Sequence, residues 1–425
     1  MMVKTRYFRK RKVAIIGLGR SGLACAELLY GLGADIKISD SLDNFSTRKN
    51  AGLLDSKKIK IELGRHTPDF IEGRELVIVS PGVQNSALPL IWARQSNIPV
   101  ISEIELAWLI CPATVIAVTG SNGKTTVTTL IARIIKEAGR KAFICGNIGR
   151  PFSAEVNNMK AGDFVSLEVS SFQLEKISEF KPKISVILNF SPNHLDRYKD
   201  IREYLAAKKR IFMNQDEGDY LVLNKKDRII KSLAASARAR VVYFQEKAGL
   251  NPNQAAVICV GRLLGIDQEI CCKVFQEFKG IEHRLEDVVQ INGIRFINDS
   301  KSTTADSTLW ALRSINSPII LIAGGKDKGV DYGVIRASAR QRVRQLILIG
   351  EAKEKIHKAL KDVVVTTQAE SLEEAVEEAF KKARRGDCVL FSPMCSSFDM
   401  FSDFEERGTF FKKAVFGLKN SLQNL

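Results

Sequence analysis

The sequence lacks the regularly spaced cysteines that disulfide frameworks and zinc sites require. Its eight cysteines are scattered along 425 residues, only Cys271 and Cys272 are neighbours, and no CxxC pair occurs. Small disulfide-stapled domains and zinc sites both depend on such pairs. We therefore expect reduced thiols that pack in the interior of the protein.

A membrane-spanning segment and a cleavable leader are also lacking. The one suspicious apolar stretch, Leu106 to Gly123, is uncharged but is interrupted by Pro112 and ends in polar residues, which makes it a poor membrane span. The basic start at residues 4 to 12 is followed by an apolar run that ends at Gly17 without a cleavage signal. These absences predict a cytoplasmic protein with a solvated basic tail.

Aromatic residues are scarce, at 8% of the chain, although the formal net charge is +16. Such a charge fits nucleic acid, an anionic membrane or highly anionic small substrates, and charge alone does not choose among them. No RNA-binding signature is present. Steering of phosphorylated substrates therefore fits at least as well as a nucleic-acid groove.

What the sequence does contain is three successive α/β blocks, which predict an α/β fold in three domains. The first opens with a strand, the glycine turn 17–22, a helix and a second strand ending at Asp40, the pattern of a Rossmann-type dinucleotide site. The third alternates five strand-like runs with helical patterns, which predicts a mostly parallel, Rossmann-like sheet. We place the domains at residues 1–102, 103–282 and 283–425.

The central block holds the most informative segment, TGSNGKTT at 119–126. It follows an apolar run and leads into a helical pattern, so backbone N–H groups and a helix dipole would surround one point where a polyphosphate can sit. Lys124 would reach the terminal phosphates, and the Thr125 hydroxyl is placed to bind Mg²⁺. The general P-loop pattern is incomplete, because Val118 stands where its first glycine is expected. A glycine-rich turn without a ligand is the alternative interpretation.

Polar residues follow two later strand patterns of this block. Glu168 ends one strand and His194 follows the next, and ligands of open α/β sheets gather at the carboxyl ends of strands. Glu168 fits the second metal-binding group that a P-loop needs. The alternative interpretation is that Glu168 is an acidic residue at the start of a helix, without a metal-binding role. His194 alone would indicate a polar loop residue, and Lys208 alone a solvated helix face.

The order of the motifs resembles the Mur ligases, the ATP-dependent amide-forming enzymes of peptidoglycan precursor synthesis. The resemblance spans nearly the whole chain. LEVSSFQLE at 167–175 and SPMCSSFDMFSDFEERG at 392–408 point to the D-glutamate-adding branch. The other matching segments are GLGRSG at 17–22, SPG at 80–82, TGSNGKTT at 119–126, GNIG at 146–149, NHLDRY at 193–198, AAKKRIF at 206–212, EHR at 282–284, NDSKST at 298–303 and GGKDKG at 324–329.

The resemblance implies a P-loop ATPase-like central domain between two Rossmann-like domains, and a ligase that forms an amide through an acyl phosphate. The implied substrates are ATP, UDP-N-acetylmuramoyl-L-alanine and D-glutamate, with Mg²⁺ as the metal. A carbamylated Lys208 would supply an anionic oxygen ligand suited to Mg²⁺. A cytoplasmic monomer without a nucleic-acid partner or a membrane span is expected.

The resemblance also implies a role for individual residues. Catalysis would fall to Lys124, His194, Lys208 and Lys301. Mg²⁺ would be held by Thr125, Glu168, His194 and Lys208. ATP would contact Gly120, Ser121, Asn122, Gly123, Lys124, Thr125, Thr126, Arg284 and Asp299. The uridine-linked substrate would contact Ser21, Asp40, Ser41, Ser80, Gly82 and Asn147, so that the first domain binds a UDP-sugar rather than NAD. D-glutamate would contact Thr303, Lys328, Ser397, Phe398 and Phe404.

The chain departs from the family pattern between Phe244 and Asn251. The family usually has extra strands and a Gly-x-His-Asn segment here, whereas this chain runs almost directly into Gly249 and has Leu250 in place of the histidine. We expect the central sheet to end early and the adenine pocket to lose one wall. NDSKST also continues as Thr304-Ala305-Asp306 rather than the more usual Asn-Pro.

Three other functions remain open from the sequence. Another Mur ligase would add a different amino acid, and a folylpolyglutamate synthetase-like ligase would lack a uridine-binding first domain. A non-catalytic nucleotide-binding or nucleic-acid-binding module would show no ATP turnover that depends on an amino acid.

Overall fold

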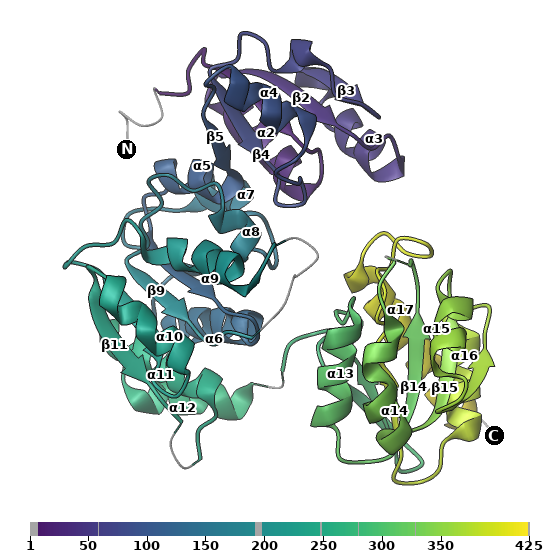
Figure 1. The fold of residues 1–425 in the computed structure, drawn as a ribbon. Helices are drawn as coiled ribbons and strands as arrows, with labels where there is room; N and C mark the ends of the chain where they lie inside the picture. The colour runs from purple at the N-terminus through teal and green to yellow at the C-terminus, as the bar shows by residue number, and fades with distance from the viewer. Residues whose placement is uncertain are drawn as a thin grey trace. The chain divides into compact units, whose positions relative to one another are not determined.

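The computed structural model describes residues 7–57, 59–191, 198–246, 249–278, 280–327 and 329–423. The chain divides into two compact units, Met1–Phe278 and Lys279–Leu425. The first unit holds two β-sheets with their helices, and the second holds one (Figure 1). Within the described ranges, every helix is too short or too polar to cross a membrane.

The N-terminal sheet is parallel throughout and has the order β3-β2-β1-β4-β5. Alternate residues of β1 face opposite layers, because Val13 and Ile15 pack with α2 whereas Ala14 and Ile16 pack with α4. The predicted Rossmann-type start is confirmed, and β3 is a strand that the sequence did not predict. The elements are β1 (Lys12–Ile16), α2 (Arg20–Gly31), β2 (Asp35–Asp40), α3 (Phe45–Gly52), β3 (Lys60–Leu63), β4 (Leu76–Val79), α4 (Leu88–Gln95) and β5 (Val100–Ser102).

The central sheet is also parallel, with the order β11-β10-β9-β6-β8-β7. Its strands are β6 (Thr114–Thr119), β7 (Ala142–Gly146), β8 (Phe164–Glu168), β9 (Ile184–Ile187), β10 (Tyr220–Asn224) and β11 (Arg240–Phe244). Within the described part of the chain the sheet ends at β11, as predicted, and no hairpin separates β11 from α11.

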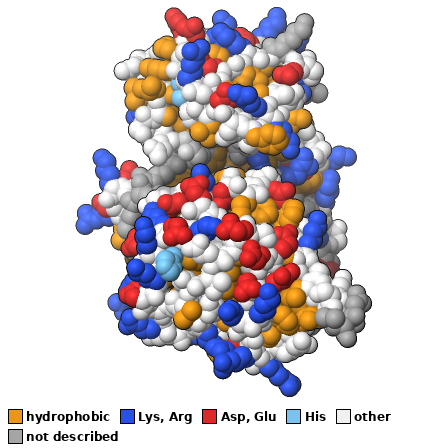
Figure 2. All heavy atoms as spheres, turned by 90° about the vertical axis from the view of Figure 1, so that its right-hand side faces the viewer, with side chains coloured by type: hydrophobic (Ala, Val, Ile, Leu, Met, Phe, Trp, Pro, Cys, Tyr) orange, Lys and Arg blue, Asp and Glu red, His pale blue; other side chains and the backbone are white. Residues whose placement is uncertain are grey.

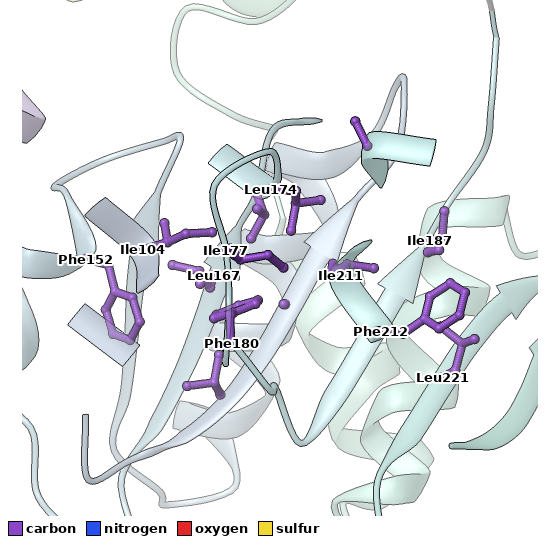
Figure 3. Close-up of a cluster of buried hydrophobic side chains, with 14 of the residues drawn as sticks. Ile104, Phe152, Leu167, Leu174, Ile177, Phe180, Ile187, Ile211, Phe212 and Leu221 are labelled. Carbon is purple, nitrogen blue, oxygen red and sulfur yellow. The ribbon is translucent and has the colours of Figure 1, made fainter. Parts of the chain in front are cut away.

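Helices cover both faces of the central sheet. One face carries α6 (Lys124–Glu137), α11 (Pro252–Leu263) and α12 (Gln268–Glu277), whose apolar residues form one core with the strands. The other core, shown in Figure 3, joins Leu167 of β8, Ile187 of β9 and Leu221 of β10 to side chains of the opposite helices. Those helices are α5 (Glu103–Ile110), α7 (Phe152–Glu155), α8 (Ser171–Leu174), α9 (Ile201–Lys209) and α10 (Arg228–Ser232).

The C-terminal sheet is mixed, with the order β12-β13-β17-β14-β15-β16. The predicted parallel strands are present, but β12 (Glu286–Ile291) pairs antiparallel to β13 through a turn at Asn292-Gly293. Both turn residues have positive φ, as a tight hairpin turn requires. The other elements are β13 (Ile294–Asn298), α13 (Ala305–Ser314), β14 (Ile319–Gly324), α14 (Arg336–Arg342), β15 (Val343–Ile349), α15 (Lys353–Leu360), β16 (Val365–Gln368), α16 (Leu372–Lys382), β17 (Cys388–Phe391) and α17 (Phe404–Gln423).

The positive charge is not spread evenly over the surface. The helix α16 exposes Glu373, Glu374 and Glu377, and Figure 2, which presents the side of the molecule where α15 and α16 lie in Figure 1, shows acidic side chains gathered there.

Candidate active site

The phosphate loop is a preformed nest between β6 and α6. Gly120 and Gly123 have φ of +155° and +81°, which side-chain-bearing residues rarely adopt. The backbone N–H of Ser121 donates to the carbonyl of Asn189 at 3.1 Å, and that of Asn122 donates to the Asn189 side-chain oxygen at 2.8 Å. The segment after β9 thus holds the loop in shape without a ligand.

Two lysines converge on one carbonyl of this loop. Lys124 Nζ and Lys208 Nζ each donate to the carbonyl oxygen of Gly120 at 3.0 Å. Lys208 is 1% exposed, so the interpretation of a solvated helix face is wrong for it. Burial, and then the neighbouring Lys124 charge, lower the pKa of Lys208 well below its ordinary value, while Glu168 acts in the opposite direction. Both burial and the Lys124 charge therefore disfavour the charged form of Lys208.

Glu168 lies at the carboxyl end of β8 and is 1% exposed. Its Oε1 accepts a hydrogen bond from Asn147 Nδ2 at 2.7 Å. Its Oε2 is buried without a hydrogen-bond partner among the described residues. An orphaned carboxylate oxygen is costly to bury, and a cation would remove that cost.

Of the other predicted metal ligands, Thr125 is described by the structure and His194 is not. Thr125 is buried at the start of α6, and His194 lies outside the described residues. In the ranges that the structure covers, no group of three or more His, Cys, Asp or Glu side chains is gathered for a metal ion. A site here would accordingly depend on the hydroxyl of Thr125 and a modified Lys208 beside Glu168.

Two of the predicted uridine-substrate residues meet at the N-terminal glycine turn. Asp40 accepts the backbone N–H of Leu18 at 2.6 Å, and Ser80 Oγ donates to the carbonyl of Gly17 at 3.1 Å. Ser21 is half-buried, whereas Ser41 and Gly82 are exposed. Asn147 does not belong to this turn, because it follows β7 in the central sheet and contacts Glu168.

In the second unit, Asp299 lies at the carboxyl end of β13 and is 3% exposed. It accepts hydrogen bonds from Ser392 Oγ at 2.8 Å and from the backbone N–H of Leu285 at 3.2 Å. Burial raises its pKa to about 6 despite these donors and the positive charge of Arg284. The two ATP residues predicted in this unit therefore lie within electrostatic reach of each other.

Four of the predicted D-glutamate residues are described: Thr303 follows β13, Ser397 and Phe398 follow β17, and Phe404 begins α17. Ser397 is buried and Phe398 is 71% exposed, Thr303 is half-buried, and Lys328 lies outside the described residues. Phe404 begins α17, and its ring centroid is 5.5 Å from Lys301 Nζ. The structure thus brings the predicted catalytic Lys301 to one of the predicted substrate residues.

Arg407 is a residue to which the sequence assigned no role. Its side chain is fully buried, and it donates to both Ser300 Oγ and the Ser300 carbonyl, at 3.1 and 2.8 Å, and to the Cys395 carbonyl at 3.1 Å. Burial lowers its pKa to about 10. Arg407 therefore ties the loop of Asp299 and Lys301 to the loop of Ser397. Its place in the FEERG segment was the only signal available in the sequence.

Comparisons with known proteins agree along the whole chain. Three family models match: "Mur ligase MurD-like, N-terminal domain" at residues 11–102, "Mur ligase middle domain" at 118–261, and "Mur ligase, glutamate ligase domain" at 283–395. A UDP-N-acetylmuramoylalanine–D-glutamate ligase of Thermoanaerobacter pseudethanolicus is 38% identical, over 96% of this chain and 99% of the relative. The ligase of the same name from Geotalea uraniireducens is 39% identical, over 95% and 97%.

Solved structures show the same fold at lower identity. The UDP-N-acetylmuramate-alanine ligase MurC of Thermotoga maritima superposes with a TM-score of 0.60 at 19% identity, covering 96% of this chain and 100% of that one. The MurF ligase of Thermotoga maritima in complex with ADP gives a TM-score of 0.57 at 16% identity, covering 97% of both chains.

Proposed function

The chain belongs to the Mur ligase family, and we propose that it is the member that joins D-glutamate to UDP-N-acetylmuramoyl-L-alanine with ATP as co-substrate, in peptidoglycan precursor synthesis. Relatives named for this reaction align over nearly the full length of the chain. The MurD-like match of the first domain disfavours a folylpolyglutamate synthetase-like ligase, for which no uridine-binding domain is expected. The protein is an ATP-dependent acid–amino-acid ligase.

The observation that best supports this reaction is that Lys124 and Lys208 both donate to the carbonyl of Gly120. Transfer of the γ-phosphoryl group to the substrate carboxylate brings two anions together, so positive charge and alignment are the main demands on the protein. Lys124 at the loop and Lys301 in the C-terminal unit would neutralise the phosphoryl oxygens. The D-glutamate amine then attacks the acyl phosphate, the new C–N bond forms, and phosphate leaves.

Residues present at the phosphate loop fit Mg²⁺. The unpartnered Glu168 Oε2 is the observation that supports a cation there, and Thr125 adds a hydroxyl. Bound Mg²⁺ would supply charge neutralisation between the phosphate oxygens. A second ion would involve His194 and a carbamylated Lys208.

The surroundings of Lys208 support its carbamylation. A lowered pKa favours the unprotonated amine, whose lone pair attacks CO₂, forms an N–C bond and releases one proton. The product is an anionic carbamate, whose charge is attracted by the neighbouring Lys124. It also supplies a hard oxygen ligand of the kind that Mg²⁺ prefers.

Two groups of residues are proposed to bind the two other substrates. Asp40 and Ser80, at the N-terminal turn, would hold the uridine-linked substrate together with Ser21, Ser41, Gly82 and Asn147. Thr303, Lys328, Ser397, Phe398 and Phe404 would hold D-glutamate and fix the direction of its amine. We also propose domain boundaries at 1–102, 103–282 and 283–425, and a monomer that works in the cytoplasm, where ATP and UDP-linked sugars are available.

Phosphate release from ATP tests this function when each substrate is omitted in turn. Release should require both UDP-N-acetylmuramoyl-L-alanine and D-glutamate, and mass spectrometry should find their amide. L-alanine, L-glutamate and meso-diaminopimelate are the matched amino acids that should give no product. Turnover with another amino acid, or phosphate release without any amino acid, would contradict the proposal.

A further inference from the structure

Asn147 donates two hydrogen bonds to the predicted metal ligand Glu168. Its backbone N–H donates to the Glu168 carbonyl at 2.9 Å, and its Nδ2 donates to Glu168 Oε1 at 2.7 Å. Gly146, which pairs with Glu168 between β7 and β8, has φ of +103°, and a Cβ there would lie 2.3 Å from the Glu168 carbonyl oxygen. The glycine permits this close approach, and the backbone therefore fixes Asn147 beside the carboxylate.

The side-chain hydrogen bond distinguishes the two oxygens of Glu168. Oε1 is occupied by the amide, whereas Oε2 is buried without a partner in the part of the chain that the structure describes. A glutamate side chain has three rotatable bonds, so a fixed donor on one oxygen selects one orientation for the other. The amide is neutral, so it orients the carboxylate without reducing the charge available to a cation.

We propose that Asn147 is a positioning residue for the metal-binding carboxylate of Glu168, in addition to the substrate contact assigned to it above. The inference rests on the proposed function, because it takes Glu168 as an Mg²⁺ ligand. Hydrogen-bond partners of metal ligands orient them, and removing such a partner commonly weakens metal affinity 10- to 100-fold. Asn147 is an exposed residue although its hydrogen bond to Glu168 is partly buried, which is compatible with the substrate contact proposed above. One amide would then connect the metal ligand with the substrate.

The test is metal affinity, which a substrate contact alone would not change. Binding of Mn²⁺, a spectroscopic substitute for Mg²⁺, is measured by electron paramagnetic resonance on the full-length protein with a non-hydrolysable ATP analogue. Asn147→Ala should raise the Kd for Mn²⁺ by roughly 10- to 100-fold. Asn158→Ala is the matched control, because Asn158 also donates to a glutamate, Glu155 at 3.2 Å, but on the exposed surface.

A double-mutant cycle with Glu168→Gln establishes whether Asn147 acts through Glu168. If it does, Asn147→Ala should cause no further loss of Mn²⁺ affinity in the Glu168→Gln background. An unchanged Kd in Asn147→Ala, or an equal loss in both backgrounds, would overturn the proposal. Calorimetric binding of UDP-N-acetylmuramoyl-L-alanine without metal measures the substrate contact separately. Ligase turnover by the wild-type protein tests the proposed function independently of either result.

Discussion

Replacing Lys208 by methionine should raise stability and destroy activity together. Methionine keeps a similar volume and fills the same buried space, but it removes the amine. The lost hydrogen bond to Gly120 contributes about 1 kcal/mol, and Lys124 still serves that carbonyl. Replacing buried charged groups by apolar residues of similar volume can stabilise a protein by about 1–4 kcal/mol, as measured for ion pairs, and the same desolvation argument applies to Lys208. We therefore expect an unfolding free energy between unchanged and about 3 kcal/mol higher.

The lowered pKa of Lys208 also makes the free energy of unfolding depend on pH. Because the folded-state pKa of Lys208 is depressed, the unfolded chain binds more protons between that pKa and the ordinary value of 10.5. The free energy of unfolding should therefore rise with pH between these two values. In Lys208→Met, the contribution of Lys208 to this rise should be absent. Thermal unfolding at several pH values measures it.

Activity should fall at least ~10²-fold in Lys208→Met, by analogy with loss of one preorganised electrostatic group. Phosphate release measures this, and a small added carboxylate should partly restore activity to Lys208→Ala by replacing the carbamate oxygen. Lys209→Met, on the exposed neighbour, should leave both quantities unchanged. A fully active Lys208→Met protein, or one that is strongly destabilised, would refute the reasoning.

Four further outcomes are expected. Lys124→Ala should lose ligation by at least ~10²-fold while calorimetry finds normal binding of the uridine-linked substrate, and equal loss of both would argue against separate sites. D-glutamate should be used and L-glutamate rejected, and Lys328→Ala should raise the apparent KM for D-glutamate more than that for ATP in steady-state kinetics. Because Leu250 replaces the expected histidine and no hairpin precedes it, competition kinetics should show weaker discrimination of ATP from GTP than in relatives with the full segment. The raised pKa of Asp299, about 6 against 3.8, means that stability should fall by about 3 kcal/mol as pH rises through that interval, and Asp299→Asn should flatten this part of a denaturant-unfolding profile.

Most helices and strands could be predicted from local sequence patterns. The strand, glycine turn and helix at 114–137 were predictable because a buried strand, a φ-permissive turn and a helical apolar stripe each leave their own signature in adjacent residues. The sequence patterns did not reveal β3 and β12 because both are edge strands that are only partly buried, so neither shows a strong apolar pattern. The Asn292-Gly293 pair is itself a hairpin signal in the sequence.

The site was less predictable, because it depends on contacts between distant parts of the chain. Lys208 bonds a carbonyl 88 residues away, and Arg407 bonds residues 107 and 12 positions away. Helical periodicity gives a buried lysine and a solvated one the same spacing. Only the resemblance to a family separated them, and no local pattern suggested that Asn147 would contact Glu168.

The early end of the central sheet also bears on how this protein behaves in concentrated solution. Among the described residues β11 has a neighbouring strand on one side only, and an edge strand offers unpaired backbone groups to any other extended chain. Here the edge is five residues long and begins with an exposed Arg240, two of the devices by which natural sheets discourage association. Brevity and charge therefore both act against association at this edge, and replacing Arg240 by a β-branched apolar residue would remove one of those two protections.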